Sequence, residues 1–427
     1  MRVAHILRKY DPAEWGGTET AILQLTNGLA SHGVDSVVYA PRLARPNIAP
    51  DALADNGCEV RRFRACLPVW GMDRARRSQL VAVSGNLVSF DLMGALWRDQ
   101  NAAVIHSHVL GRIGAVGLRV ARRRRIPFVV SIHGGLYDLP AEVRQGMAPG
   151  PGNNGVDWGK IVGMLLRSRG MVDETDAIVT CNPREAKLIS ERHPRLRVMV
   201  QPHGVPAARF AADQQDQARR AFPQLQGRPM LLVPGRVDPV KNQDWVAGQM
   251  KELLRRHPDL VVVSVGPCTH AAYGQTLERR LRDEGLENHF ILAGKLPPGD
   301  PRLIGLMQMA SAVLLPSLSE TFGLVILEAW AAGTPVISSR TSGALSLVEP
   351  GVNGWLFDLS SPEQFHGAVD ALLSDSSRSR AMGGTGRALV RREYDSVVLA
   401  RRMQRLYQEL SAEAAGPSVG TPSPCVT

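Results

Sequence analysis

Two acidic residues, Glu320 and Glu328, lie eight positions apart in the segment SLSETFGLVILEA, directly after a strand-like apolar run. A helix is expected to begin near Gly323, and the amides of its first turn have no acceptor within the helix. Those of Phe322, Gly323 and Leu324 are therefore expected to face an anion or a hydroxyl group. Glu328, inside the helix, suits a pair of sugar hydroxyls because each carboxylate oxygen accepts one hydrogen bond. A buried structural carboxylate is the alternative for Glu328.

A basic loop is the second candidate. The segment VPGRVDPVKN follows the apolar run Met230–Val233 and contains Arg236 and Lys241. Together these two cations are suited to neutralising a diphosphate. Only six of the fifty basic residues of the chain are lysines, so Lys241 is less expected as ordinary surface charge. Solvated loop charges are the alternative.

Two glycines near the N-terminus form a weaker candidate. Gly16 and Gly17 follow the first strand-like run and precede a helix expected from Thr18. Glycines let backbone amides approach a phosphate closely, and the N-terminus of a helix favours its negative charge. A tight turn alone would also explain the pair.

Histidines after strand-like runs are the last candidates. His133 follows Phe128–Ile132 and precedes two glycines, so its side chain is placed to hydrogen-bond a sugar or phosphate oxygen. A structural histidine is the alternative. His106 and His108 follow another run and rank lower because no glycines flank them.

The elements that must position these residues form two series of short apolar runs with helix-like stretches between them. Parallel strands buried on both faces produce such runs, so the pattern predicts an α/β protein with two doubly wound domains. The first series of strands is expected at Val3–Leu7, Val34–Ala40, Val104–His106, Phe128–Ile132, Ala177–Thr180 and Val198–Gln201. The second is expected at Met230–Val233, Leu260–Val265, Phe290–Ala293, Ala312–Leu315 and Pro335–Ser338.

The expected boundary lies in the segment PHGVP, which gives domains of residues 1–203 and 204–390. Residues 139–160 are rich in glycine and proline and are interpreted as a loop over a site. Residues 412–427 are small, Pro-rich and Ser/Thr-rich, which predicts a disordered tail.

Composition and charge limit the function classes. Hydrophobic residues make up 44% of the 427-residue chain, which excludes wholesale disorder. No apolar run approaches the roughly 18 residues that span a bilayer, and the five cysteines form no CxxC pair. These features favour a cytoplasmic protein. Residues 1–203 contain 27 basic and 18 acidic residues, a net charge of +9, which suggests an anionic partner or a solvated Arg-rich surface.

Taken together, these motifs resemble those of the retaining glycosyltransferases of family 4. The resemblance rests on the Glu-x7-Glu segment with its continuation EAWAAGTPVI, and on the later run GVNGWL. The loop with Arg236 and Lys241, the opening GGTE and the His133 loop belong to the same pattern, which extends from Arg2 to about Leu410. His203 and Trp330 depart from the residues usual in the family, at positions that are not catalytic there.

The resemblance implies a GT-B fold, in which two Rossmann-like domains face each other across a cleft. Its last helix, here about residues 391–410, crosses back to the first domain. Arg236 and Lys241 would bind the diphosphate, Glu320 the donor sugar and Glu328 the ribose. The other residues implied in donor binding are Gly16, Gly17, His133, Gly266, Lys295, Leu296, Thr321, Phe322, Gly323 and Leu324. No metal ion and no cofactor are expected.

The implied reaction is transfer of a sugar, with a hexose expected, from a nucleoside diphosphate, UDP or GDP, to a glycan, lipid-linked or small-molecule acceptor. Polysaccharide biosynthesis is the expected context. An epimerase of the same fold and a non-catalytic sugar-nucleotide-binding protein are the alternatives. Nucleic-acid binding is not expected, because no aromatic-rich strand face or zinc spacing accompanies the arginines.

The family's acceptors suggest contact with the cytoplasmic face of an anionic membrane. The arginine clusters at residues 119–125 and 74–77 are candidates for that contact. Their alternative roles are surface charge and complementing the dipole at a helix C-terminus.

Overall fold

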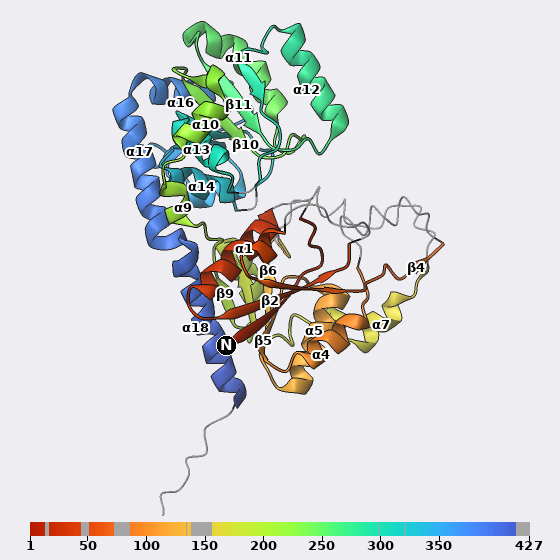
Figure 1. Cartoon of the computed structure of the whole chain (residues 1–427). Coiled ribbons are helices and arrows are strands. Elements are labelled where there is room, and N and C mark those ends of the chain that lie inside the picture. Colours follow the sequence, from red (N-terminus) through yellow and green to blue (C-terminus); the bar gives the residue numbers. More distant parts are fainter. Residues whose placement is uncertain are drawn as a thin grey trace, which may run out of the picture. The chain divides into compact units, whose positions relative to one another are not determined.

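The computed structural model describes residues 1–12, 17–43, 51–71, 86–133, 135–137, 156–297, 299–320 and 322–415. The chain forms two compact units (Figure 1). Unit 1 contains Met1–Pro202 and the C-terminal segment from Leu399, and unit 2 contains His203–Val398. The observed division after Pro202 lies one residue before the division expected from sequence.

Unit 1 is built on a parallel sheet of seven strands in the order β3-β2-β1-β5-β6-β8-β9. Its strands are β1 (Arg2–Ile6), β2 (Asp35–Pro41), β3 (Glu59–Phe63), β5 (Ala102–Ser107), β6 (Phe128–Ile132), β8 (Ala177–Thr180) and β9 (Val198–Val200). Strands β4 (Val69–Trp70) and β7 (Val156–Asp157) form a separate antiparallel pair. Strands β1, β5, β6 and β8 are buried or nearly so along their length, as expected for a sheet covered on both faces.

Helices cover both faces of this sheet. Alternate residues of each strand point to opposite sides, so the apolar strands present two faces that must be buried. Val116 and Val120 pack on one face beside Ile105, whereas Met403 and Tyr407 lie in the cluster with Val104 on the other. The helices of unit 1 are α1 (Gly17–Ala30), α2 (Ala52–Asp55), α4 (Asp91–Arg98), α5 (Gly111–Arg124), α7 (Gly159–Leu165), α8 (Pro183–Arg192) and the short 3-10 helix η1 (Ser168–Gly170).

Unit 2 repeats this plan with six parallel strands in the order β12-β11-β10-β13-β14-β15. They are β10 (Met230–Pro234), β11 (Val261–Val265), β12 (Phe290–Leu292), β13 (Ala312–Leu315), β14 (Val336–Ser339) and β15 (Gly354–Phe357). Its helices are α9 (Ala207–Ala211), α10 (Gln215–Ala221), η2 (Pro223–Leu225), α11 (Gln243–Arg256), α12 (Ala271–Asp283), α13 (Pro301–Met309), α14 (Leu324–Ala332), α15 (Ser342–Leu347), α16 (Pro362–Ser374), α17 (Ser376–Leu389) and η3 (Val390–Tyr394).

The last helix, α18 (Ser396–Ala415), packs on unit 1 from Leu399 onward. The Gln201 side chain donates to the Leu399 carbonyl oxygen at 2.7 Å, and Gln404 donates to that of His32 at 3.1 Å. The return to unit 1 thus begins later than the expected residue 391. The expected disordered tail is wrong for residues 412–415, which are helical, and its remainder lies outside the described residues.

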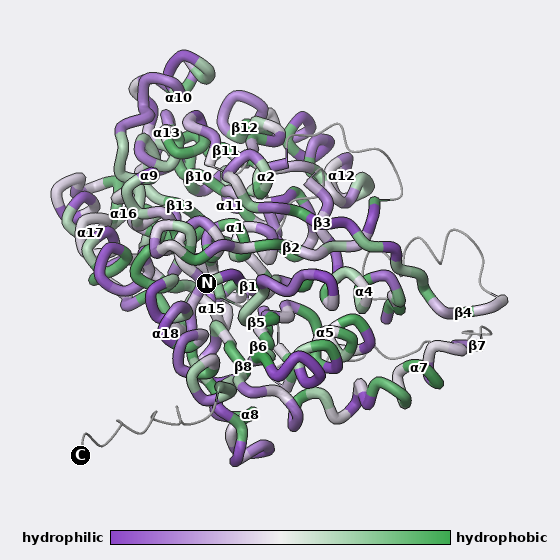
Figure 2. Tube along the Cα trace, turned by 60° about the horizontal axis from the view of Figure 1, so that its bottom comes forward, coloured by the Kyte–Doolittle hydropathy of each residue, from purple (hydrophilic) through white to green (hydrophobic). Residues whose placement is uncertain are grey.

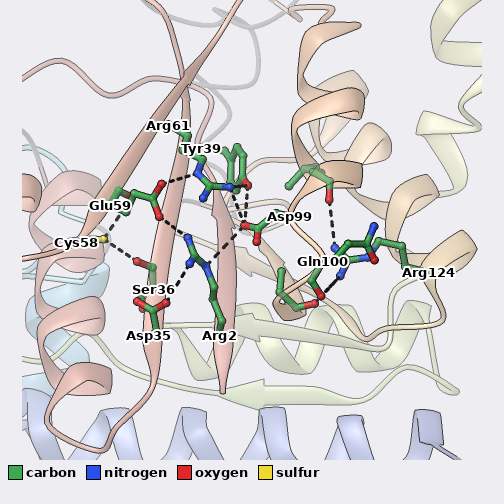
Figure 3. A network of polar contacts seen from close by, with 12 residues as sticks. Arg2, Asp35, Ser36, Tyr39, Cys58, Glu59, Arg61, Asp99, Gln100 and Arg124 are labelled. Carbon is green, nitrogen blue, oxygen red and sulfur yellow. Dashed lines mark hydrogen bonds and ion pairs between the residues drawn. The ribbon is translucent and has the colours of Figure 1, made fainter.

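Much of the arginine charge of unit 1 is used within the unit. Arg2 of β1 pairs with Glu59 of β3 and with Asp35 at 3.4 Å, and Arg61 pairs with Asp99 at 3.2 Å (Figure 3). At the end of α5, Arg124 donates to three backbone carbonyl oxygens at 2.9 to 3.2 Å. Arg119 pairs with Glu174 and Arg122 with Asp176. Three of the five arginines at residues 119–125 therefore stabilise the fold, and residues 74–77 lie outside the described residues.

Candidate active site

Three glycines bring the carboxyl ends of neighbouring strands together in unit 2. The Gly235 amide, after β10, donates to the Val265 carbonyl oxygen at 2.8 Å, and the Gly266 amide, after β11, donates to that of Gly294 at 2.9 Å. Gly266 has a φ of +155°, and a Cβ there would lie 2.0 Å from the Gly235 carbonyl oxygen. Only glycine fits this crossing, which draws the loops after β10, β11 and β12 to one edge of the sheet.

Asp238 organises the basic loop after β10. Its Oδ1 accepts from the Lys241 amide at 2.9 Å, and its Oδ2 lies 3.2 Å from Nη2 of Arg236. The Asp238 side chain is 8% exposed, whereas that of Arg236 is 53% exposed. A buried carboxylate thus holds the loop while the guanidinium reaches toward solvent. Sequence reasoning did not single out Asp238, although its place between two cations was a usable signal.

Lys241 and Glu320, from two different loops, meet directly. Lys241 Nζ lies 2.5 Å from Glu320 Oε2, and both side chains are mostly buried. Backbone contacts join the two loops, since the Leu318 amide donates to the Val240 carbonyl oxygen at 2.8 Å. The Asn242 side chain also donates to the Pro316 carbonyl oxygen at 3.1 Å. The fold therefore brings together two side chains that are 79 positions apart in the sequence.

The start of α15 holds the loop after β13 through hydrogen bonds. The Gly343 amide and the Ser342 hydroxyl donate to the Glu320 carbonyl oxygen at 2.9 and 3.1 Å. A Cβ at Gly343 would lie 2.7 to 2.9 Å from backbone atoms of Phe322, so glycine is required for this contact as well. Sequence reasoning missed this support, for which the glycine after β14 was the only signal.

The start of α14 presents free amides beside Glu320. Gly323 has a φ of +87° and precedes Leu324, the first residue of the helix. The Phe322 ring is buried and packs edge-on against His203, with ring centroids 5.0 Å apart. Thr321 lies outside the described residues. The Ile326 amide donates to the Gly323 carbonyl oxygen at 2.9 Å, whereas those of Leu324 and Val325 precede the first acceptors of the helix and suit an anion or a hydroxyl group.

Glu328 lies in the second turn of α14. The residue as a whole is half-buried, and burial of its carboxyl group raises the pKa to about 7. Its helix neighbours Leu327 and Ala329 are fully buried. Among the described residues no cation pairs with this carboxyl group, and perturbed groups of this kind are candidates for a functional site.

Lys295 and Leu296 follow Gly294 at the same sheet edge. The Lys295 side chain is exposed, and that of Leu296 is half-buried. The Gly266–Gly294 contact places their backbone beside the loop after β11.

In unit 1, His133 belongs to a chain of imidazoles. His5 Nδ1 lies 3.0 Å from His108 Nε2, and His108 Nδ1 lies 2.8 Å from His133 Nε2. Burial lowers the pKa of His5 to about 3 and that of His133 to about 4, so both rings are neutral at pH 7. His108 lies between these two neutral rings, and each of its contacts joins one N–H donor to one acceptor nitrogen. Sequence reasoning missed His5, which lies inside β1 and has no polar neighbour to mark it.

His106 has a structural role instead. It lies within β5, fully buried, with Nδ1 2.6 Å from the Tyr407 hydroxyl and Nε2 2.7 Å from the Ser131 hydroxyl. The nitrogens of His5, His106 and His108 lie within 4.8 Å of one another, an arrangement that could suit a metal ion. Ligation by all three would break one of the His106 contacts, so the pattern favours a hydrogen-bonded relay.

At the N-terminus, α1 begins at Gly17, one residue before the expected start. Gly16 lies outside the described residues. A Cβ at Gly17 would meet no atom within 4 Å, so local packing does not require glycine at that position.

Two family models match most of the chain. The family described as "Glycosyl transferases group 1" matches residues 214–389, and the "Glycosyl transferase 4-like domain" matches residues 16–204. The chain belongs to glycosyltransferase family 4. The D-inositol 3-phosphate glycosyltransferase of Acidothermus cellulolyticus is 28% identical to this glycosyltransferase over 393 residues, 90% of this chain and 84% of the relative. The corresponding protein of Frankia alni is 29% identical over 419 residues, 94% of this chain and 96% of the relative.

Solved structures confirm the fold class of this glycosyltransferase. Anabaena HepE in complex with UDP matches with a TM-score of 0.72 and 15% identity, over 96% of this chain and all of HepE. Sucrose-phosphate synthase from Thermosynechococcus elongatus matches with a TM-score of 0.69 and 20% identity, over 96% and 98% of the two chains. The prediction of two Rossmann-like units of the GT-B class is therefore confirmed.

The pKa of Glu328 makes the stability of the glycosyltransferase depend on pH. Its ordinary value is 4.5 and its folded value about 7, so the folded protein holds this proton more tightly than the unfolded chain. The contribution of Glu328 to stability is therefore greatest at low pH and falls as pH rises through about 7. We expect Glu328→Gln to gain stability relative to the wild type between about pH 5 and pH 8. Urea unfolding of both proteins across this range measures the difference, and a constant difference would contradict the assignment.

Proposed function

We propose that this glycosyltransferase moves a sugar from a nucleoside diphosphate to an acceptor hydroxyl, with retention of the anomeric configuration and without a metal ion. The bond between the anomeric carbon and the phosphate oxygen breaks, and a bond to the acceptor oxygen forms on the same face of the sugar. The acceptor's proton passes to the phosphate oxygen. The products are the glycoside and the free nucleoside diphosphate.

The observation that carries this proposal is the pair of cations at the strand ends of unit 2. Asp238 holds the loop of Arg236 and Lys241, and Lys241 contacts Glu320 at 2.5 Å beside the first amides of α14. Negative charge develops on the diphosphate as the sugar departs. Donors already in place stabilise that charge without reorganising, which is the largest source of catalysis in many enzymes.

We assign the following roles to the individual residues, which this arrangement supports for unit 2. Arg236 and Lys241 offset the charge of the diphosphate, and Glu320 with the amides of residues 322–324 orients the donor sugar. Glu328, with no cationic partner among the described residues, accepts from the two ribose hydroxyls. His133 is neutral at pH 7 and therefore suits a hydrogen bond to a sugar hydroxyl more than a charge contact.

We propose UDP as the nucleotide, ahead of GDP, because the structures of HepE hold UDP, UDP with glucose, and UDP-glucose. The curated relatives named above are D-inositol 3-phosphate glycosyltransferases. A phosphorylated polyol is therefore the first acceptor to test. Glycan and lipid-linked acceptors follow it.

A donor screen tests the proposal. Thermal unfolding is measured with UDP, GDP and ADP and with their sugars, since a ligand that binds only the folded protein raises the midpoint. We expect UDP and a UDP sugar to stabilise unit 2. Incubation with the donor alone then separates transfer from epimerisation, because an epimerase would produce a new nucleotide sugar. If none of the nucleoside diphosphates raises the unfolding midpoint, the proposal is contradicted.

Metal independence gives a further prediction. Arg236 and Lys241 replace the divalent ion that other glycosyltransferases use to offset the diphosphate charge. We therefore expect the rate of transfer to be unchanged by excess EDTA. Loss of activity on chelation, with recovery on addition of magnesium or manganese, would refute the metal-free site.

We also propose that the protein works in the cytoplasm at the surface of an anionic membrane. None of the described helices is long and apolar enough to cross a bilayer. Contact would therefore be peripheral. The arginines that end α5 are poor candidates for it, because three of them are engaged within unit 1.

A further inference from the structure

Helix α7 exposes its apolar residues and buries its glycines. Ile161, Met164 and Leu165, at spacings that share one helix face, have exposed fractions of 62%, 72% and 75%. Gly159 and Gly163, four residues apart, are buried on the opposite side. A surface helix of a soluble domain normally shows the reverse pattern. Figure 2 shows the apolar residues of α7 in green next to the pair of strands β4 and β7.

The inverted orientation is fixed by Arg112, which lies beneath the helix. A Cβ at Gly159 would lie 2.5 Å from Nη1 of Arg112, and one at Gly163 would lie 3.4 Å from its Nε. The Arg112 side chain is buried, and its Nη2 lies 2.5 Å from Asp157 Oδ2. A larger residue at 159 would clash with Arg112, and one at 163 would be tight against it. The two glycines thus favour the observed orientation, with the apolar face outward.

Unpaired cations border the same helix. A hollow of about 630 Å³ beside α7 is lined by Arg112, Lys160, Arg167, Ser168 and Arg169 among others. Arg112 is paired with Asp157, the acidic residue of the lining. Within the described part of the chain, no carboxylate forms an ion pair with Lys160, Arg167 or Arg169, although Arg167 is near enough to Glu174 to help lower the pKa of that carboxyl. Three cations thus line a hollow whose one acidic lining residue, Asp157, is already paired with Arg112.

We propose that α7 and this hollow form a docking surface for the anionic headgroups of a lipid bilayer. The cations would hold headgroup phosphates in the hollow, and the three apolar side chains would enter the boundary of the acyl chains. Trp70 of β4 adds an aromatic side chain that is 66% exposed. Its ring centroid lies 6.4 Å from that of Trp158. Such rings favour the headgroup level of a membrane.

The charge of the surface favours a bilayer over a second copy of the chain. Residues 1–203 have a net charge of +9, from 27 basic and 18 acidic residues, and pairing two α7 surfaces would bring like charges together. An anionic bilayer instead matches both the cations and the apolar face. The inference rests on the proposed function in one respect, namely that the protein works at a membrane surface. The binding of vesicles itself requires no sugar donor or acceptor.

Co-sedimentation of the full chain with vesicles tests the surface. Vesicles of phosphatidylcholine with phosphatidylglycerol are compared with phosphatidylcholine alone, at low and high salt. We expect binding to the anionic vesicles at low salt that weakens at high salt. The charge variant K160Q/R167Q/R169Q should lose about 100-fold in vesicle affinity. The apolar variant I161S/M164S/L165S should lose binding comparably.

The matched control is R123Q/R125Q/R195Q, which removes three exposed arginines from the same unit. It should retain most of the binding, and all variants should bind UDP as the wild type does, which separates this test from that of the proposed function. Three results would overturn the proposal: absence of binding by the wild type, equal binding by the α7 variants, or a larger loss in the control. The wild type could instead self-associate without lipid. If I161S/M164S/L165S abolishes that association, the face is an interface between copies of the chain.

Discussion

Replacement of Lys241 by alanine is expected to lower kcat by about 10²–10³-fold, the loss typical when one donor to a developing anion is removed. Lys241 is held by its amide contact to Asp238 and by the 2.5 Å contact with Glu320. Its charge is therefore already in place when the diphosphate departs. Removal also leaves Glu320 without its partner, which further disturbs the donor sugar. Steady-state rates at saturating UDP sugar measure the effect.

The matched control for Lys241 is Lys251→Ala. Lys251 lies on α11, and its side chain is 74% exposed and 3.5 Å from that of Glu284. An exposed pair of this kind contributes little, so rate and stability should stay near those of the wild type. If both Lys241→Ala and Lys251→Ala keep the wild-type kcat, Lys241 has no catalytic role.

The second large effect is expected from Glu328→Ala, which should weaken donor binding by about 10- to 100-fold. A hydrogen bond to a charged acceptor contributes about 1.5–3 kcal/mol, and Glu328 would accept two such bonds from the ribose. Burial has raised its pKa to about 7, so part of this binding energy is spent on ionising the group near neutral pH. Calorimetric titration with UDP at about pH 8, where the carboxylate predominates, measures the loss.

Glu278→Ala on α12 is the control for this substitution, because Glu278 is exposed and helical. A 2′-deoxyuridine diphosphate titration sharpens the test. The deoxy nucleotide should bind the wild type more weakly than UDP does, whereas Glu328→Ala should scarcely distinguish the two. Equal discrimination by both proteins would show that Glu328 does not contact the ribose.

The central strands were predictable from sequence because they are buried on both faces. Phe128–Ile132, Ala177–Thr180 and Ala312–Leu315 have the same bounds in the structure as in the sequence prediction. Two of the four edge strands, β3 and β15, were missed, whereas β9 and β12 were predicted. Edge strands face solvent, so EVRRF carries charges and GWLF begins with glycine, and neither run is continuously apolar.

The site was predictable where it follows from a rule of parallel sheets. Polar residues after neighbouring strands gather at one edge, and this rule brings Lys241 to Glu320. Their supports were marked in the sequence only by position, Asp238 between two cations and Gly343 after a strand. The contacts of Asp238 and Gly343 depend on the exact approach of two loops, and His5 resembles any residue inside a strand.

The glycine-rich stretch at residues 139–160 was interpreted as a loop, and this is wrong for its last residues. Residues 156–157 form β7 and α7 begins at Gly159. Here Gly159 serves close packing on Arg112 instead of chain reversal. Composition alone cannot distinguish these two uses of glycine, because the partner that requires it lies 47 positions earlier in the sequence.

The anomeric configuration of the product tests the central claim most directly. The wild type is incubated in EDTA with an α-linked UDP sugar and D-inositol 3-phosphate, then with glycan or lipid-linked acceptors if the first is not used. Proton NMR identifies the new linkage and any change in the donor. We predict an α-linked glycoside and free UDP, with no epimerised donor and a strongly reduced yield from Lys241→Ala. A β-linked product, or a new nucleotide sugar formed without transfer, would contradict the account.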